Sequence, residues 1–437
     1  MATRIDAQAP GFENAFQRLL EAKREIGEDV DDAVRAILAD TRARGDAAVI
    51  DYTAKFDQFD LTPSTMAFGP EEIAGARQQC SADVLDALEL AAARITDYHK
   101  RQMPGDLEYT DDAGVRLGYR WTSIQSVGLY VPGGTAAYPS SVLMNALPAR
   151  IAGVERLAMV VPTPGGEINP LVLAAAAIAG IDEIYRVGGA QAVGALAYGT
   201  ETIAPVDKIV GPGNAYVAAA KRQVFGAVGI DMVAGPSEIL VLADGANDPA
   251  WIAADLLSQA EHDTNAQSIL ITDDTAFADA VEGAIDGHLK TLARADIAGA
   301  SWRDFGVVIV VGDLADAVSL IDRLAPEHLE IATEDPDALG VQVRNAGAIF
   351  LGRYAPEALG DYVAGPNHVL PTSRSARFSS GLGVLDFVKR TSIIGCDAEA
   401  LAKVGPAAIS LATAEGLDAH GLSVAIRLNK GNPTGNS

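Results

Sequence analysis

Cysteine is nearly missing from this 437-residue chain, which has only Cys80 and Cys396, more than three hundred positions apart. This excludes a disulfide framework and a metal site built from CxxC pairs. Basic clusters are missing too, because no run of Lys and Arg exceeds two residues and the formal charge is −25. Nucleic acids are bound by clustered Lys and Arg, so we expect no nucleic-acid partner.

Long apolar runs are also lacking. The most apolar stretch, residues 171–181, has eleven residues and is too short to cross a bilayer. The first thirty residues contain scattered acidic residues and no apolar core of a signal peptide. We therefore expect a cytoplasmic protein with no membrane partner. With 49% apolar and 21% charged residues, the composition is that of a globular protein, and the length predicts two to four structural units.

Short apolar runs alternate with helical segments along most of the chain. Apolar residues at helical spacing predict helices in the first hundred residues. Beyond them we expect strands at residues 126–131, 157–161, 183–187, 208–210, 239–242, 268–271, 307–311 and 348–351. Continuous Val, Ile and Leu runs between helices indicate parallel strands covered on both faces. The sequence thus predicts an α/β fold with two Rossmann-like α/β/α units and small helical N- and C-terminal segments.

Two familiar catalytic signatures are missing. The nucleophile motif GxSxG is not present, and neither cysteine has a neighbouring His that would lower the pKa of its thiol. The dinucleotide motif GxGxxG is also missing. Gly211-Pro212-Gly213-Asn214 follows an expected strand with two glycines, but it lacks the third. We therefore do not expect a covalent thiohemiacetal intermediate, and any dinucleotide site departs from the standard pattern.

Six histidines are present, and two of them lie in motifs that suit chemistry. Gln259 and His262 are three residues apart at the end of an expected helix over residues 249–260, so both side chains can converge on one metal ion. A His at a helix C-terminus also simply complements the helix dipole. Glu327-His328 can serve as a general acid–base pair if both side chains face a cleft. The alternative is an exposed, capped helix end.

A Gly-, Pro- and Ser-rich loop over residues 352–383 contains Asp361 and His368. Long irregular segments inside compact chains are usually functional, so Asp361 could ligate a metal and His368 could face a substrate. The alternative for Asp361 is an Asx-turn. His420 follows an expected helix over residues 406–417 and could be a ligand or a surface residue.

The ordered set of these segments resembles the histidinol dehydrogenase family. Any one segment is weak, but together they span about three hundred residues in the family's order. The resemblance rests on Tyr130-Val-Pro-Gly-Gly134, Val187-Gly-Gly-Ala-Gln191, Val210-Gly-Pro-Gly-Asn214, Ala234-Gly-Pro-Ser-Glu238, Gln259-Ala-Glu-His262, Pro326-Glu-His-Leu329, residues 360–368 and Ala414-Glu-Gly-Leu-Asp-Ala-His420.

The resemblance implies an NAD-dependent zinc enzyme that oxidises L-histidinol through the aldehyde to L-histidine, the last steps of histidine biosynthesis. It implies a homodimer with shared active sites, one zinc ion per subunit, and His420 supplied by the partner subunit. Glu327 would activate water and His328 would be the general acid/base. The implied zinc ligands are Gln259, His262, Asp361 and His420; these, with His328, Ser237, His368 and Glu415, would bind substrate, while Tyr130, Gln191 and Asn214 would contact NAD.

The same resemblance suggests a division of labour between domains. We expect an N-terminal helical segment over residues 1–25. A first α/β domain over residues 26–129 and 239–383 would have a helical N-terminal part and carry the zinc and catalytic residues. Residues 130–238 would form the second Rossmann-like, NAD-contacting domain, and residues 384–437 a C-terminal part that reaches the partner subunit.

Three other functions compete with this one. A relative with the same fold could oxidise a different polar alcohol, although His368 and Glu415 suit an imidazole and an ammonium group. A zinc hydrolase could use Glu327 as base for metal-bound water, but the Gly-ended parallel strands disfavour it. A nucleotide-binding regulatory or scaffold protein would not need metal-type side chains at four separate places in the chain.

Overall fold

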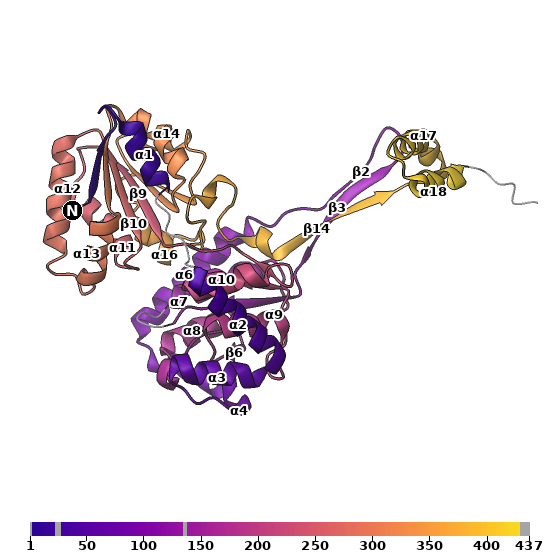
Figure 1. Ribbon diagram of the computed structural model, residues 1–437, viewed down its shortest axis with the longest axis horizontal. Coiled ribbons are helices and arrows are strands. Elements are labelled where there is room, and N and C mark those ends of the chain that lie inside the picture. The colour runs from indigo at the N-terminus through magenta and orange to yellow at the C-terminus, as the bar shows by residue number, and fades with distance from the viewer. Residues whose placement is uncertain (1, 22–27, 134–137, 429–437) are drawn as a thin grey trace, which may run out of the picture. The chain divides into compact units, whose positions relative to one another are not determined.

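The computed structural model describes residues 2–21, 28–133 and 138–428 (Figure 1). The chain divides into two compact units. The first is formed by Met1–Gln102 and Ile124–Asp386, and the second by Met103–Ser123 and Phe387–Ser437. Within the described ranges, none of the helices combines the length and apolarity that a membrane span requires.

One half of the first unit is built on a six-stranded parallel sheet, ordered β1-β11-β10-β9-β12-β13. Residues of β9 point alternately to two apolar cores, one on each face. Helices α1 (Phe12–Glu21) and α14 (Ala317–Leu324) cover one face, and α11 (Pro249–Ala260), α12 (Thr275–His288) and α13 (Ala295–Phe305) cover the other. The strands are β1 (Thr3–Asp6), β9 (Glu238–Ala243), β10 (Gln267–Thr272), β11 (Val307–Val310), β12 (His328–Ala332) and β13 (Ala348–Leu351).

The other half of the first unit is a five-stranded parallel sheet, ordered β6-β5-β4-β7-β8. Helices α2 (Glu28–Arg44), α9 (Gly189–Tyr198) and α10 (Ala215–Val224) share one apolar core with the sheet. Helix α7 (Pro139–Ile151) contacts β4, and α6 (Ala82–Lys100) and α8 (Pro170–Ile178) pack against α7. The strands are β4 (Ser126–Tyr130), β5 (Arg156–Val160), β6 (Glu183–Tyr185), β7 (Lys208–Val210) and β8 (Gly229–Ile230).

The predicted fold class is confirmed, since two parallel sheets with helices on their faces make up the first unit. The long N-terminal helices pack on the half that holds the five-stranded sheet, where α2 contacts α9 and α10. One detail near the N-terminus differs from the expectation of helices alone. Thr3–Asp6 forms β1, which adds to the edge of the six-stranded sheet beside β11 and buries Ile5.

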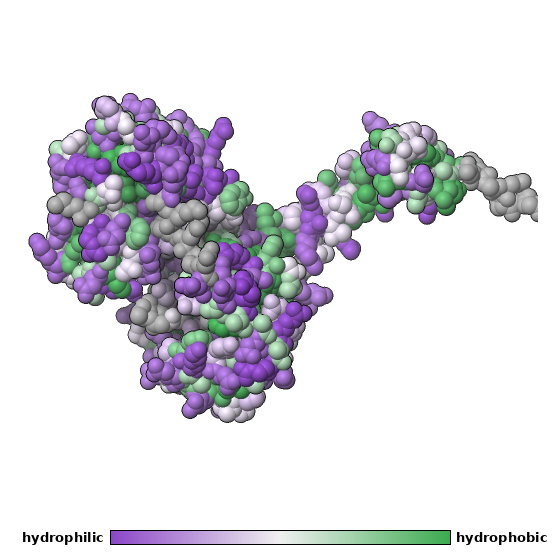
Figure 2. All heavy atoms as spheres, in the orientation of Figure 1, coloured by the Kyte–Doolittle hydropathy of each residue, from purple (hydrophilic) through white to green (hydrophobic). Residues whose placement is uncertain are grey.

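The second unit is small and has few buried side chains. Its antiparallel sheet is ordered β14-β3-β2, with β2 (Leu107–Thr110), β3 (Arg116–Ser123) and β14 (Val388–Gly395). Helices α17 (Ala398–Ala414) and α18 (Asp418–Leu428) pack against each other, with the small residues Gly405, Ala412 and Gly421 at their contact, while Ala400 lies near Gly114. Several large apolar residues are exposed there, and hydrophobic colour is visible over both helices in Figure 2.

Candidate active site

A buried acid and imidazole lie at the start of β12. Glu327 immediately precedes the strand and His328 is its first residue, opposite Ile239 of the neighbouring β9. Backbone groups of Glu238 hold both side chains. The Glu238 N–H donates to Glu327 Oε2 at 2.9 Å, and His328 Nδ1 lies 3.0 Å from the Glu238 carbonyl oxygen. Both side chains are thus held by backbone atoms of the adjacent parallel strand, and side-chain motion cannot easily disturb these atoms.

This arrangement determines which nitrogen of His328 can act. A carbonyl oxygen only accepts hydrogen bonds, so Nδ1 carries the proton and Nε2 presents its lone pair. Burial lowers the pKa of His328, which keeps the ring neutral near pH 7. Burial also raises the pKa of Glu327 well above its usual value. A neutral imidazole with a free lone pair, beside a carboxyl whose pKa is displaced upward, is suited to proton transfer near neutrality.

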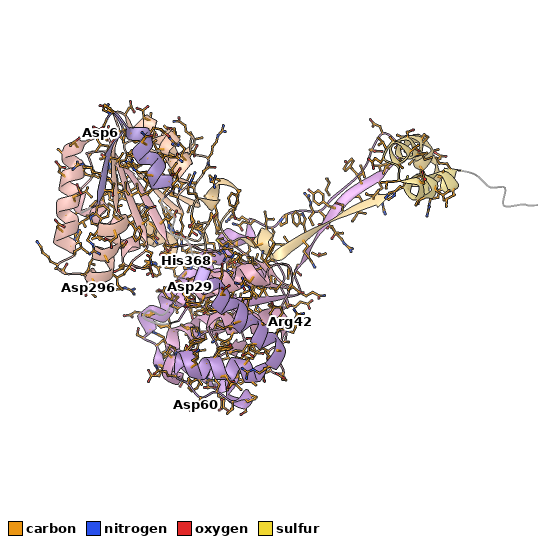
Figure 3. All side chains as sticks on the ribbon, viewed as in Figure 1. Asp6, Asp29, Arg42, Asp60, Asp296 and His368 are labelled. Atoms are coloured by element: carbon orange, nitrogen blue, oxygen red, sulfur yellow. The ribbon has the colours of Figure 1, made fainter. Side chains whose placement is uncertain are left out.

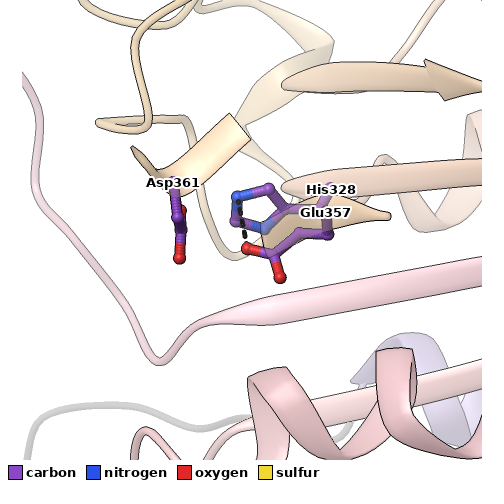
Figure 4. Close-up of side chains that lie close together, drawn as sticks. All are labelled: His328, Glu357 and Asp361. Carbon is purple, nitrogen blue, oxygen red and sulfur yellow. Dashed lines mark ion pairs between the residues drawn. The ribbon is translucent and has the colours of Figure 1, made fainter. Parts of the chain in front are cut away.

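Helix α16 (Glu357–Tyr362) brings two more acids to His328 (Figure 4). Glu357 and Asp361 are four residues apart, which places them on one face of the helix. Glu357 Oε1 lies 3.6 Å from His328 Nε2. Donor atoms of His328, Glu357 and Asp361 all lie within 4.8 Å of one another, close enough to surround one metal ion. The sequence analysis singled out Asp361 but missed Glu357, whose only signal is that helical spacing.

Hydrogen bonds between Glu357 and two neighbouring residues, Glu330 and Ser258, anchor α16. The Glu357 N–H donates to Glu330 Oε1 at 2.5 Å, and the Ser258 hydroxyl donates to Glu357 Oε2 at 3.2 Å. Burial, followed by the charge of Asp361, raises the pKa of Glu357 to about 9. Burial raises the pKa of Glu330 well above its usual value as well, and the charge of Asp255 adds to this. Burial therefore favours the neutral form of both carboxyls.

Asp361 lies between two imidazoles and is ionised. Its Oδ2 is 4.0 Å from His262 Nε2, and its Oδ1 is 3.6 Å from His368 Nδ1. Burial acts to raise the pKa of Asp361, but the hydrogen bond and charge of His368, together with His328 and His262, outweigh it and hold the pKa at about 2. His368, labelled in Figure 3, also lies 3.3 Å from the hydroxyl of Ser141 through Nε2.

Gln259 and His262 occupy the C-terminal end of α11. Gln259 is 1% exposed, and its Oε1 has no hydrogen-bond partner among the described residues. A buried carbonyl oxygen without a partner costs free energy unless a ligand satisfies it. His262 follows the helix and is about one-third exposed, with its ring directed to Asp361. Gln259 and the His262–Asp361 pair therefore have the donor types of an oxygen- and nitrogen-rich metal site.

The remaining substrate and metal candidates are placed differently. Ser237 is half-buried directly before β9, and its carbonyl oxygen accepts from the Gln267 N–H at 2.9 Å. Glu415 follows α17 and His420 lies in the first turn of α18, both in the second unit and both exposed. The roles predicted for Glu415 and His420 in the site of the first unit therefore stay predictions.

The three NAD-contact candidates all follow or end strands of the five-stranded sheet. Tyr130 ends β4 and is buried, and its hydroxyl accepts from the Gly189 N–H at 2.9 Å. Gln191 lies in the first turn of α9, 1% exposed, with Oε1 lacking a partner among the described residues. Asn214 is exposed and caps α10 by accepting from two backbone N–H groups. Gly134, the last residue of the first glycine motif, lies outside the described residues.

Comparison with known proteins gives a consistent result. A family model described as histidinol dehydrogenase matches residues 20–428. Histidinol dehydrogenases from Rhodospirillum rubrum and Ruegeria pomeroyi are 68% and 65% identical to this chain; the matches cover 99% and 98% of it and 100% and 98% of those proteins. The crystal structure of histidinol dehydrogenase from Elizabethkingia anophelis matches with a TM-score of 0.92 at 35% identity, covering 98% of each chain.

Proposed function

The chain belongs to the histidinol dehydrogenase family, a family of oxidoreductases, and we propose that it catalyses the NAD-dependent oxidation of L-histidinol through L-histidinal to L-histidine. The observation that supports this best is the buried Glu327–His328 pair, held by both backbone groups of Glu238. Oxidation of an alcohol to an acid needs two bases at different stages. One takes the hydroxyl proton, and one takes a proton from the water that adds to the aldehyde.

His328 is the base for the first oxidation in this proposal. Its Nε2 lone pair accepts the hydroxyl proton of the alcohol while Nδ1–H stays bonded to the Glu238 carbonyl. That hydrogen bond keeps the ring in one tautomer and one orientation, so Nε2 is already oriented to accept the proton. Asp361, the ionised acid whose donor atom lies within 4.8 Å of that of His328, stabilises the imidazolium that results.

Glu327 is the base for the second oxidation. Glu327 is 6% exposed, so its carboxyl is largely shielded from bulk water. The upward displacement of its pKa by burial makes the carboxylate a stronger base than an exposed glutamate. It takes a proton from the water that attacks the aldehyde, and the hydrate that forms is the species oxidised next.

Zinc fits the residues at the end of α11 and on α16. We assign it to Gln259, His262 and Asp361, with His420 completing the set from a second subunit. The unpartnered, buried Gln259 Oε1 and the ionised Asp361 carboxylate are oxygen donors that a cation would satisfy. Zinc held by these residues would supply a site that orients the imidazole and amine of histidinol, so that orientation would contribute to catalysis. Ser237, His368 and Glu415 are the further substrate contacts in this proposal.

NAD fits the ends of β4 and β7 and the start of α9. Gln191 Oε1 and Thr163 Oγ1 are buried there and lack partners among the described residues. The backbone of Gly188 lies close to Pro162, because a Cβ on Gly188 would lie 2.4 Å from the Pro162 side chain. We assign contacts to Tyr130, Gln191 and Asn214. When bound, NAD accepts the hydride that leaves the substrate carbon.

A homodimer is the assembly we propose, with each second unit docking on the partner. The described part of this unit leaves large apolar side chains in water, and such patches usually mark an interface. The exposed residues include Leu107, Tyr109, Ile394, Leu411, Leu417, Leu422 and Ile426. A dimer would also explain why the exposed His420 and Glu415 have metal- and ammonium-binding side chains on a surface. We place the enzyme in the cytoplasm.

The test measures NADH formed from L-histidinol and, separately, from L-histidinal, with metal content determined on the same sample. Two NADH per histidinol and one per histidinal are expected, and a chelator should abolish both signals until zinc is restored. Turnover only of other polar alcohols would assign a different substrate to the same fold. Hydrolysis without NADH formation would overturn the proposal.

A further inference from the structure

A buried ion pair lies in the half of the first unit that holds the five-stranded sheet. Lys221 of α10 and Asp231, just after β8, contact each other with side chains only 2% and 1% exposed. Removing two charges from water is costly, and apolar residues in their place often give an equally stable fold. A pair this deeply buried calls for an explanation other than stability.

Both polar backbone groups of Gly211 are bound by this pair. Lys221 Nζ donates to the Gly211 carbonyl oxygen at 2.8 Å, and the Gly211 N–H donates to Asp231 Oδ2 at 2.8 Å. The other oxygen, Oδ1, accepts from the Met232 N–H at 2.6 Å. The ion pair therefore binds both the carbonyl group and the N–H group of Gly211, the first residue after β7.

Gly211 occupies a position that only glycine tolerates. Its φ is +110°, and a Cβ there would lie 2.1 Å from the carbonyl oxygen of Tyr130 at the end of β4. The turn 211–214 ends at Asn214, whose side chain accepts from the Tyr216 and Val217 N–H groups to cap α10. The ion pair fixes the first residue of the turn, and the cap fixes the last.

We propose that Lys221 and Asp231 are positioning residues for the dinucleotide: they hold the 211–214 turn against the end of β4, so that Asn214 and the neighbouring Tyr130 present a preformed surface to NAD. This inference rests on the proposed function, which assigns Asn214 and Tyr130 to NAD. Neither charged side chain touches the cofactor, because both are buried beneath the turn. Their effect is to reduce the ordering that binding would otherwise require.

The test compares Lys221→Met, Asp231→Asn and the double variant with the wild-type enzyme. Initial rates are measured with NAD and histidinol varied separately, and melting temperatures are taken on the same samples. We expect the KM for NAD to rise about 10- to 100-fold, the range that a small misplacement of a binding group produces. The KM for histidinol should change little. The double variant, which leaves no unpaired charge, should regain melting temperature relative to the single variants but keep the raised KM for NAD.

A matched control pair exists on the amino edge of the same sheet. Arg156 of β5 and Glu183 of β6 form an ion pair whose guanidinium also donates to the carbonyl oxygens of Ala204 and Pro205. Arg156 in this partly exposed pair holds backbone carbonyl groups as Lys221 does, but away from the 211–214 turn. Arg156→Met with Glu183→Gln should lower the melting temperature and leave the KM for NAD unchanged.

The outcomes separate this inference from the proposed function. If the Lys221 and Asp231 variants behave like the control, with lower melting temperature and wild-type KM for NAD, the pair is only structural and the inference fails while the function stands. If the single variants do not fold, the double variant decides by direct NAD binding in calorimetry, and wild-type affinity there overturns the inference. A wild-type enzyme that neither binds nor reduces NAD overturns both.

Discussion

Replacing Glu327 by Gln tests the division of labour between the two bases. The amide oxygen of Gln can still accept from the Glu238 N–H, which lies 2.9 Å from Glu327 Oε2 in the present structure. Because burial already favours the neutral form of Glu327, a neutral amide introduces no new buried charge. We therefore expect the free energy of unfolding to change by less than about 1 kcal/mol. What the variant loses is the ability to take a proton.

The expected kinetic effect follows from that loss. General-base catalysis contributes about 10²- to 10⁴-fold, so oxidation of L-histidinal should slow by about 100-fold or more, equivalent to about 2.7 kcal/mol of transition-state stabilisation. In the proposed mechanism His328 is the base for oxidation of L-histidinol to the aldehyde, so this step should slow far less. Single-turnover NADH formation with each substrate resolves the two steps, and the aldehyde should accumulate when the alcohol is supplied.

His328→Asn is the matched control, with the opposite pattern expected: the alcohol step should suffer at least as much as the aldehyde step. Equal slowing of both steps by Glu327→Gln would refute the assignment of water activation to Glu327. The pair would then act as one unit in both oxidations.

Other predictions address the metal, the buried acids and the cysteines. His420→Asn should lose zinc and activity while the dimer persists in ultracentrifugation; full activity would remove His420 from the site. Burial raises the pKa of Glu330, so the stability that its protonated form contributes is complete below about pH 4 and is lost as pH rises through the folded-state pKa. Glu330→Gln should therefore flatten the loss of stability between about pH 5 and pH 8 in denaturant titrations. An unchanged dependence of the unfolding free energy on pH would contradict this. Cys80→Ser with Cys396→Ser should leave kcat nearly intact, and a large loss would contradict the absence of a covalent intermediate.

The sheets could be predicted because their strands are continuous apolar runs, and periodicity alone signals such runs. The strand at residues 239–242, for example, is the buried β9. Strand β12 escaped prediction because it begins with His328 and contains Glu330, polar residues that become buried in the middle of a sheet. Its polar character comes from the site it supports, so local propensity pointed to an exposed segment. Strands β2 and β3 of the second unit were missed because few of their residues are buried.

The site could be predicted in part for a related reason. Motifs identified Glu327, His328, Asp361 and His368, and the structure places all of them in one neighbourhood. Glu357 was missed because an acid in a Gly- and Pro-rich segment is usually a surface residue, and only tertiary packing buries it to 1% exposure. Glu238 was noticed in a motif, yet its contribution comes from its backbone, which no side-chain pattern reveals.

One expectation about sheet edges applies to only half of the molecule. Ligands of open α/β sheets bind beyond the carboxyl ends of the strands, and Tyr130 and the 211–214 turn follow that rule. In the six-stranded sheet the acid–imidazole pair instead lies at the amino ends of β9 and β12. The amino end of a strand offers unpaired N–H groups, and one of them, on Glu238, binds the Glu327 carboxyl. This backbone hydrogen bond holds the Glu327 carboxyl at the amino edge of the sheet.

The second unit has a small core, so its stability would depend on association with another chain. Ala400, Gly405, Ala412 and Gly421 bury little surface, whereas Leu411, Leu422 and Ile426 face outward. Under the proposed dimer, a newly made chain exposes these apolar side chains to solvent until it associates with a second copy. We then expect protein yield to depend on whether dimerisation is faster than aggregation, and to be highest at moderate concentration and low temperature, where the hydrophobic effect weakens.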